Sequence, residues 1–259
     1  MSREKVALIT GGSSGLGKMA VAILGRENWR LMVNCRRYPG ELDKWVADVT
    51  GCDVEMGFSI GDISRKNEAE KVVRETLERY GRIDALIHAV GPFIRKRKWF
   101  IEHSTEEIEQ LVRGNLLSAM WMAHSVLPVM RRQKWGRLLF FGFGRAMEAP
   151  AWPDRSVYAA AKTGLVSLTK TLAVEEAPYG ITVNMICPGD IVRERKEMWI
   201  NDVKEIRDDE TPCGRPGSGE DVARLILFLL RQKSDFVTGN ILQVTGGLDV
   251  IHPVSKREQ

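Results

Sequence analysis

The stretch Thr10-Gly11-Gly12-Ser13-Ser14-Gly15-Leu16-Gly17 decides the fold, because it joins an apolar segment, residues 5–10, to a helical pattern. Its glycines at positions 11, 15 and 17 let the backbone approach a pyrophosphate and let helix and strand pack closely. The amino end of the helix supplies unpaired amide N–H groups and the positive end of a dipole. The spacing differs from the commoner Gly-x-Gly-x-x-Gly, so its place between a first strand and a first helix carries the interpretation. The stretch predicts a phosphate-binding turn.

Short apolar segments alternate with helical patterns along the rest of the chain. The expected strands are residues 5–10, 30–35, 53–58, 83–89, 137–142, 181–187 and 240–244. Several are apolar on consecutive residues, which is typical of strands buried on both faces of a parallel sheet. Ser64 is the expected N-cap of one helix. The pattern predicts an α/β fold, a single-domain Rossmann-type doubly wound parallel sheet of about seven strands flanked by helices.

The bulk properties narrow the class of protein. The 259 residues show no repeat or linker, so one domain over 1–259 is expected, with a charged substrate-lid insert at 193–211 and a tail at 253–259. Apolar runs are too short to cross a bilayer and the first residues show no secretion signal, which favours a cytoplasmic protein. A net charge of +4 is too small to indicate nucleic-acid binding. The scattered Cys and His residues predict no metal site.

Two arginines, Arg36 and Arg37, follow the second expected strand about 20 residues after Gly17. An acidic residue there would hydrogen-bond the ribose hydroxyls of NAD and repel a 2′-phosphate. Guanidinium groups bind phosphate through paired hydrogen bonds instead. The pair favours NADP(H), the alternative being two solvated loop residues.

Tyr158 and Lys162 lie four residues apart, on one face of an expected helix. A free tyrosine has a pKa of about 10, too high for acid–base work near neutral pH. A cation within about 4–6 Å would stabilise the phenolate and lower the pKa of Tyr158. The pair therefore indicates proton transfer, and the alternative is an ordinary surface pair.

In combination, these motifs resemble those of the short-chain dehydrogenase/reductase family over nearly the whole chain. The matching positions are the turn from Thr10 to Gly17, Asp62-Ile63, Asn115, Tyr158 with Lys162, and Pro188-Gly189. The family's Asn-Asn-Ala-Gly signature is present as His88-Ala89-Val90-Gly91, with its first and third letters changed. The segment from Gly214 to Gly247 is similar to the end of 3-oxoacyl-(acyl carrier protein) reductases.

The resemblance implies the roles of individual residues. Tyr158 would protonate a carbonyl oxygen as hydride arrives at the carbon, Lys162 would also hold the nicotinamide ribose, and Asn115 would support a water chain to the lysine. His88 would take the asparagine's place beside the cofactor rather than act as a base. The expected cofactor-binding residues are Gly11, Ser13, Ser14, Gly15, Leu16, Gly17, Arg36, Arg37, Asp62, Ile63, His88, Ala89, Val90, Gly91, Tyr158, Lys162, Pro188, Gly189 and Ile191.

The family's catalytic serine is missing. Alignment on the strand motif puts Phe143 in its place, whereas the family's usual interval before Tyr158 gives Arg145. Loss of one positioned donor typically costs about 10²–10³ in rate. Three explanations stay open. A backbone amide or the Arg145 side chain replaces the donor; a substrate such as a pteridine-like ring needs none; or Phe143 stacks on a flat substrate. The expected substrate-pocket residues are Phe143, Arg145, Trp152 and Met198.

The sequence thus predicts an NADPH-dependent enzyme that reduces a carbonyl to an alcohol and is similar to 3-oxoacyl-(acyl carrier protein) reductases. The alternatives are a pteridine or other ring-carbonyl reductase, and a non-catalytic NADP(H)-binding sensor. Arg131, Arg132 and Lys134 form a basic cluster that could receive an acidic acyl carrier protein. The resemblance also implies a homotetramer built on the helices that start near Thr105 and Ser156.

Overall fold

The computed structural model describes residues 4–251, and its centre is one parallel sheet with the strand order β3-β2-β1-β4-β5-β6-β7. The strands are β1 Val6–Thr10, β2 Arg30–Cys35, β3 Met56–Ile60, β4 Ala85–His88, β5 Gly136–Phe141, β6 Ile181–Pro188 and β7 Ile241–Val244. The helices are α1 Gly15–Gly25, α2 Leu42–Thr50, α3 Lys66–Tyr80, α4 Thr105–Val112, α5 Ser118–Gln133, α6 Ser156–Glu176, α7 Ile200–Val203 and α8 Gly219–Leu230. The predicted doubly wound sheet is confirmed.

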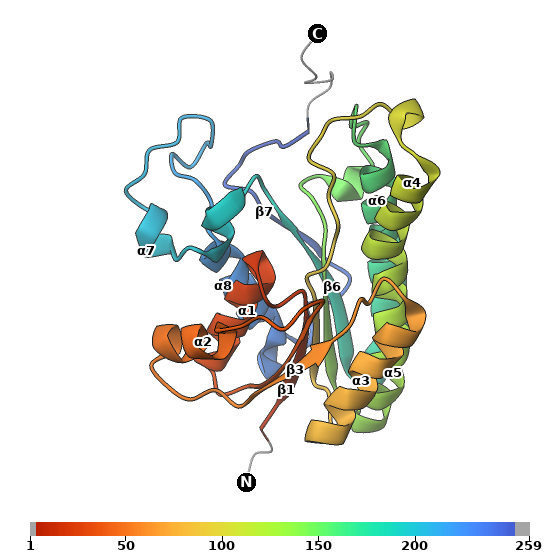
Figure 1. Ribbon diagram of the computed structural model, residues 1–259, viewed down its shortest axis with the longest axis vertical. Helices are drawn as coiled ribbons and strands as arrows, with labels where there is room; N and C mark the ends of the chain where they lie inside the picture. The colour runs from red at the N-terminus through yellow and green to blue at the C-terminus, as the bar shows by residue number, and fades with distance from the viewer. Residues whose placement is uncertain (1–3, 252–259) are drawn as a thin grey trace.

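The helices form a layer on each face of the sheet. In Figure 1, α3, α5 and α6 lie on one side and α1, α2 and α8 on the other. Strand β1 shows why its sequence is apolar at every position. Val6 and Leu8 belong to the core beneath α3, α5 and α6, whereas Ala7 and Ile9 belong to the core beneath α1 and α8. Successive side chains of a strand point to opposite faces, so a strand between two helical layers has no solvent face.

Two local expectations differ from the structure. The third strand spans Met56–Ile60 instead of residues 53–58, because its register is set by pairing with β2, from Leu31 opposite Met56 to Cys35 opposite Ile60. Ser64 is not an N-cap, since α3 begins at Lys66 with Arg65 in the cap position. The Ser64 amide instead donates to Asp62 Oδ1 at 3.1 Å. A side chain that binds nearby backbone in this way favours a turn over a helix start.

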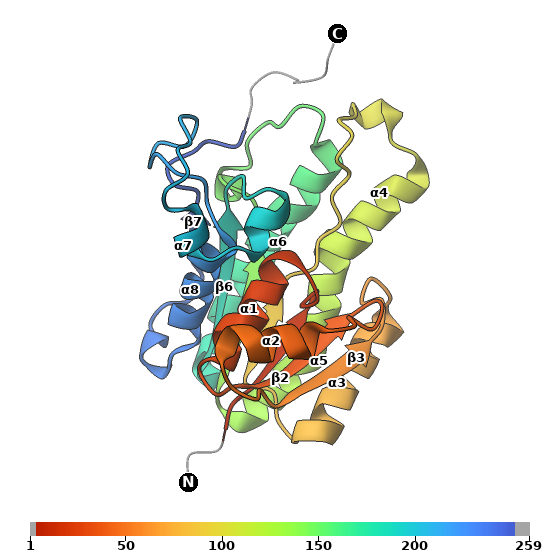
Figure 2. The same ribbon diagram turned by 60° about the vertical axis from the view of Figure 1, so that its left-hand side comes forward.

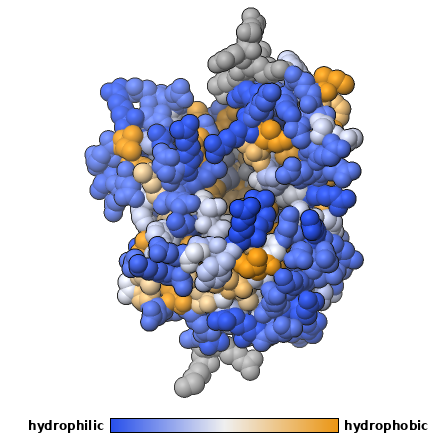
Figure 3. Space-filling view, viewed as in Figure 1, coloured by the Kyte–Doolittle hydropathy of each residue, from blue (hydrophilic) through white to orange (hydrophobic). Residues whose placement is uncertain are grey.

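The strand order reverses between β1 and β4, which pair in register with Thr10 opposite His88. Ligands of open α/β sheets bind outside the carboxyl ends of the strands at such a reversal. On the face of the molecule drawn in Figure 3, a hollow with hydrophobic residues at its base lies between hydrophilic flanks.

The expected insert at 193–211 begins with a short 3₁₀ turn, Arg193–Glu197, followed by α7. That turn packs against α1, and Figure 2 shows this part of the chain next to the amino end of α1. The expected tail at 253–259 lies outside the described residues. Between residues 4 and 251, no helix combines the length and apolar character needed to cross a lipid bilayer.

Candidate active site

The glycine turn brings the carboxyl end of β1 onto the amino end of α1. Gly11 has a φ of +67°, which a residue with a Cβ rarely adopts. A Cβ on Gly17 would lie 2.3 Å from the Gly11 carbonyl oxygen, so only glycine permits this close packing. Ser14 is the N-cap of α1 and its side chain makes no cap hydrogen bond. The Gly15 amide donates instead to the Glu197 carboxylate at 2.7 Å, so this helix start binds an anionic group. The turn fits the phosphates of a dinucleotide.

The other expected cofactor residues follow the carboxyl ends of neighbouring strands. Arg36 and Arg37 are exposed directly after β2, and Asp62 and the buried Ile63 follow β3. Residues 88–91 are at the end of β4, and residues 188–191 are at the end of β6. The Gly189 amide there donates to the Val244 carbonyl of β7 at 2.8 Å. The fold thus gathers these residues along one edge of the sheet.

Tyr158 and Lys162 lie on the same face of α6; the Lys162 side chain is buried and the Tyr158 ring is partly buried against the core. Burial lowers the pKa of Lys162 to about 8 and raises the pKa of Tyr158. The expectation of a lowered Tyr158 pKa is therefore wrong for the chain by itself. Burial penalises the charged form of each group and is the largest cause of both pKa shifts.

Asn115 lies in a π-helical turn, Arg113–Leu117, between α4 and α5. Its Nδ2 donates to the carbonyls of Pro92 at 2.8 Å and Leu111 at 2.9 Å. Its Oδ1 is buried and accepts no hydrogen bond from the residues that the structure describes. A Cβ at Gly91 would lie 2.8 Å from this oxygen and 3.0 Å from Lys162 Nζ, so glycine leaves room between the two groups. A buried acceptor left open is costly, and a bridging water would satisfy it.

His88 is fully buried and connects three parts of the site. Its Nδ1 lies 3.0 Å from Thr10 Oγ1 and its Nε2 lies 3.1 Å from Ser118 Oγ. Because Ser118 Oγ donates its own proton to the Gly114 carbonyl at 2.8 Å, we assign the imidazole proton to Nε2 and the accepting role to Nδ1. Burial, with a smaller contribution from Lys162, lowers the pKa of His88 to about 3. His88 is thus a neutral bridge near neutral pH.

Aromatic rings surround Tyr158 where the family places its serine. Phe143 is only 4% exposed and its ring centroid lies 5.0 Å from Trp152 and 6.1 Å from Tyr158. Phe93 packs edge-on against Tyr158 at 5.0 Å. The structure therefore places Phe143 in the core behind Tyr158, whereas Phe93 is 45% exposed beside it. No sequence motif points to Phe93, although its position two residues after Gly91 indicates the loop that follows β4.

Arg145 does not point toward Tyr158. Its Nε pairs with Glu148 at 2.7 Å and its Nη1 with Asp249 at 2.6 Å, both near the surface. Met198 follows the 3₁₀ turn that packs on α1, and its carbonyl accepts from the Glu220 amide at 3.3 Å. Of the four expected substrate-pocket residues, Phe143 and Trp152 contact the Tyr158 ring and the other two lie apart from it.

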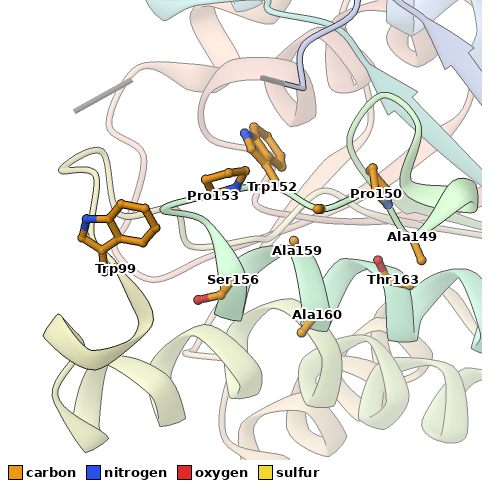
Figure 4. A pocket seen from close by; sticks show the side chains of 10 residues that line it. Trp99, Ala149, Pro150, Trp152, Pro153, Ser156, Ala159, Ala160 and Thr163 are labelled. Atoms are coloured by element: carbon orange, nitrogen blue, oxygen red, sulfur yellow. The ribbon is translucent and has the colours of Figure 1, made fainter. Parts of the chain in front are cut away.

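A pocket of about 480 Å³ lies on the opposite face of α6 (Figure 4). Its α6 residues are Ser156, Ala159, Ala160 and Thr163. At 100° per residue these positions face away from the pair at 158 and 162. Loop 149–153 and Trp99 complete the lining, and the Trp152 ring, whose centroid is 6.2 Å from that of Tyr158, also belongs to the candidate active site. Within residues 4–251, no group of three or more His, Cys, Asp or Glu side chains is arranged to hold a metal ion.

Known proteins are similar to this chain over almost its whole length. A family model described as Enoyl-(Acyl carrier protein) reductase matches residues 11–249. YtkK of Bacillus subtilis, named as an oxidoreductase, is 42% identical over 247 residues, which are 95% of this chain and 97% of that protein. The 3-oxoacyl-[acyl-carrier-protein] reductase FabG of Staphylococcus epidermidis is 30% identical over 248 residues, 95% of this chain and 99% of FabG.

A solved structure from Bacillus thuringiensis, described as a 3-oxoacyl-reductase, has a TM-score of 0.88 and 41% identity to this chain. The match covers 96% of this chain and 100% of the other. Together with the glycine turn and the Tyr158–Lys162 pair, these likenesses show that the chain belongs to the short-chain dehydrogenase/reductase family of oxidoreductases.

Proposed function

We propose that this protein reduces a carbonyl to an alcohol with NADPH. The observation that carries the proposal is the convergence of Tyr158, Lys162 and the open acceptor of Asn115 beside a glycine turn that fits a dinucleotide. A bound nicotinamide coenzyme would supply the hydride. Tyr158 would give its proton to the carbonyl oxygen. Burial raises the pKa of the phenol and opposes this transfer, so the step would depend on stabilisation of the phenolate by the Lys162 ammonium.

Lys162 and Asn115 would then return a proton to the Tyr158 phenolate. Lys162, with a pKa of about 8, exchanges protons readily near neutral pH. Asn115 Oδ1 is suited to hold a water between the lysine and the loop at Pro92, whose carbonyl already accepts from Nδ2. This relay gives both residues a function that coenzyme binding alone would not require, which argues against the sensor alternative.

The coenzyme preference rests on Arg36 and Arg37. Both are exposed at the end of β2, free to bind a 2′-phosphate through their guanidinium groups. The substrate class is a 3-oxoacyl thioester by analogy with FabG, to which the chain is 30% identical. The ring of Phe93, half exposed against Tyr158, favours a second candidate, a flat ring carbonyl that stacks there.

The test is NADPH oxidation over a panel of 3-oxoacyl thioesters and ring carbonyls. We expect turnover with NADPH at least about tenfold more efficient than with NADH, and the preference should disappear when Arg36 and Arg37 are both replaced by Ser. Tyr158→Phe should lose more than about 10³ in kcat while its Kd for NADPH stays within about twofold of wild type. Tight NADPH binding without turnover of any substrate would instead support the sensor.

A carrier protein is proposed as the donor of an acyl substrate. Arg131 is already paired with Glu176 at 2.6 Å, so the free charges of the cluster are Arg132 and Lys134, both exposed before β5 begins. They lie at the amino end of the sheet, away from Tyr158 of the same chain. A carrier protein bound there would therefore have to deliver its acyl group to the active site of a neighbouring subunit in an oligomer. An unchanged rate with carrier-bound substrate in Arg132→Glu/Lys134→Glu would exclude this surface.

A further inference from the structure

Glu197 reaches from the 3₁₀ turn Arg193–Glu197 to the amino end of α1. Its Oε1 accepts from the Gly15 amide at 2.7 Å, and its Oε2 pairs with Lys18 Nζ at 2.9 Å. The ammonium of Lys18 is itself held over the Trp45 ring at 4.0 Å. The carboxylate is therefore bound by a helix amide and by a cation that is fixed in place.

These donors belong to the phosphate-binding turn. Gly15 is the first residue of α1, so its amide has no partner within the helix and points toward any anion at the helix start. The neighbouring Lys196 side chain covers the same glycine, with its Cδ 3.6 Å from where a Cβ would stand. A carboxylate of this chain thus occupies a position that the coenzyme phosphates would use.

The rest of the segment is attached by contacts that do not involve the glycine turn. The Ile200 amide donates to Glu220 Oε2 at 2.7 Å, and Arg26 lies over the Trp199 ring at 3.9 Å. These contacts join residues 199 and 200 to α8 and α1. The Glu197 carboxylate can therefore leave the glycine turn while residues 199 and 200 keep the insert attached to the rest of the protein.

We propose that Glu197 is an anionic latch that competes with the coenzyme phosphates for the Gly15 amide and Lys18. The latch rests on the proposed function, because it requires a dinucleotide at the glycine turn. Coenzyme binding expels the carboxylate and releases the 193–197 turn, so the segment expected to cover the substrate becomes free to move only after the coenzyme has bound. The protein therefore binds the coenzyme more weakly than it would if Glu197 did not occupy the Gly15 amide and Lys18.

The first test is the Kd for NADPH, measured by fluorescence titration for wild type, Glu197→Ala, Glu197→Gln and the control Glu194→Ala. Glu194 is exposed in the same turn and carries the same charge. We expect Glu197→Ala to bind NADPH about three- to tenfold more tightly, the size of one net hydrogen bond. Glu197→Gln keeps an acceptor but no charge and should fall between, and Glu194→Ala should match wild type.

The second test is limited trypsin digestion at Arg195 and Lys196, which reports the release of the turn. NADPH should speed cleavage of the wild-type protein, whereas Glu197→Ala should be cut fast with or without NADPH. If NADPH slows cleavage of the wild type, or if Glu197→Ala binds NADPH equally or more weakly, Glu197 is a structural contact and the latch is wrong. If wild type binds neither NADPH nor NADH, the proposed function itself fails and the latch fails with it.

Discussion

At the scale of single residues, His88 shows how burial decides the role of a titratable group. Its ring accepts from Thr10 and donates to Ser118, and its pKa is lowered from 6.5 to about 3. In this pH range the unfolded chain binds more protons than the folded one, so the free energy of unfolding decreases as the pH falls from about 6.5 toward 3. The slope for one such group is about 1.4 kcal/mol per pH unit.

His88→Asn should remove this slope. We expect the variant to be less stable than wild type at pH 7.5 by about 1–3 kcal/mol, because the shorter amide cannot reach both hydroxyls. Below pH 6.5 the difference should narrow, since only the wild type is destabilised by protonation of His88. Urea unfolding at pH 7.5, 5.5 and 4.5 measures this, with His124→Asn, an exposed histidine of α5, as the control. Parallel curves for wild type and His88→Asn would contradict the assignment of a neutral His88.

At the scale of elements, the contact between α1, α8 and the 193–197 turn depends on a glycine. A Cβ at Gly219 would lie 2.0 Å from the Lys196 carbonyl oxygen and 2.5 Å from Met19 Cγ. The first residue of α8 therefore sets how closely the turn approaches α1. Ser218 caps this helix by accepting from the Asp221 amide, so the helix start itself does not depend on a side chain at position 219.

Gly219→Ala should move the turn away from α1 without a change of charge. We expect Glu197 to lose its contact with Gly15, so that NADPH binds more tightly and trypsin cuts at Lys196 faster than in wild type. The matched control is Gly164→Ala within α6, whose Cβ would be 3.3 Å from the nearest atom, a flexible Leu116 methyl group. An unchanged Kd together with faster cleavage would show that the turn can move without affecting the phosphate site.

At the scale of the whole molecule, α4 and α6 begin at Thr105 and Ser156, where the resemblance places the helices of an oligomer. The outer face of α6 carries small residues and borders the pocket of Figure 4. We expect a homo-oligomer that uses this face. Ala160 is exposed at its centre, so Ala160→Arg should lower the mass measured by light scattering while thermal unfolding of the remaining species stays cooperative. A wild-type protein of monomeric mass would contradict the oligomer.

Much of this molecule could be predicted from its sequence because the relevant patterns are local. Consecutive apolar residues indicate strands buried on both faces, a glycine turn indicates where β1 meets α1, and a four-residue interval places Tyr158 and Lys162 on one helix face. Right-handed crossovers between parallel strands predict a doubly wound sheet, but the order of its strands is known only from the structure. Strand ends were less predictable, as β3 shows, because they depend on the neighbouring strand.

Only the tertiary structure decided which groups are buried and which distant segments of the chain are in contact. The Tyr158 pKa moves opposite to the local expectation, because the cost of removing a charge from water depends on everything packed around the ring. The same holds for Phe143, whose burial in the core beside Tyr158 depends on segments distant in the sequence. Glu197 meets Gly15 across 182 residues, a contact that no periodicity encodes because it arises from two loops meeting at one edge of the folded sheet.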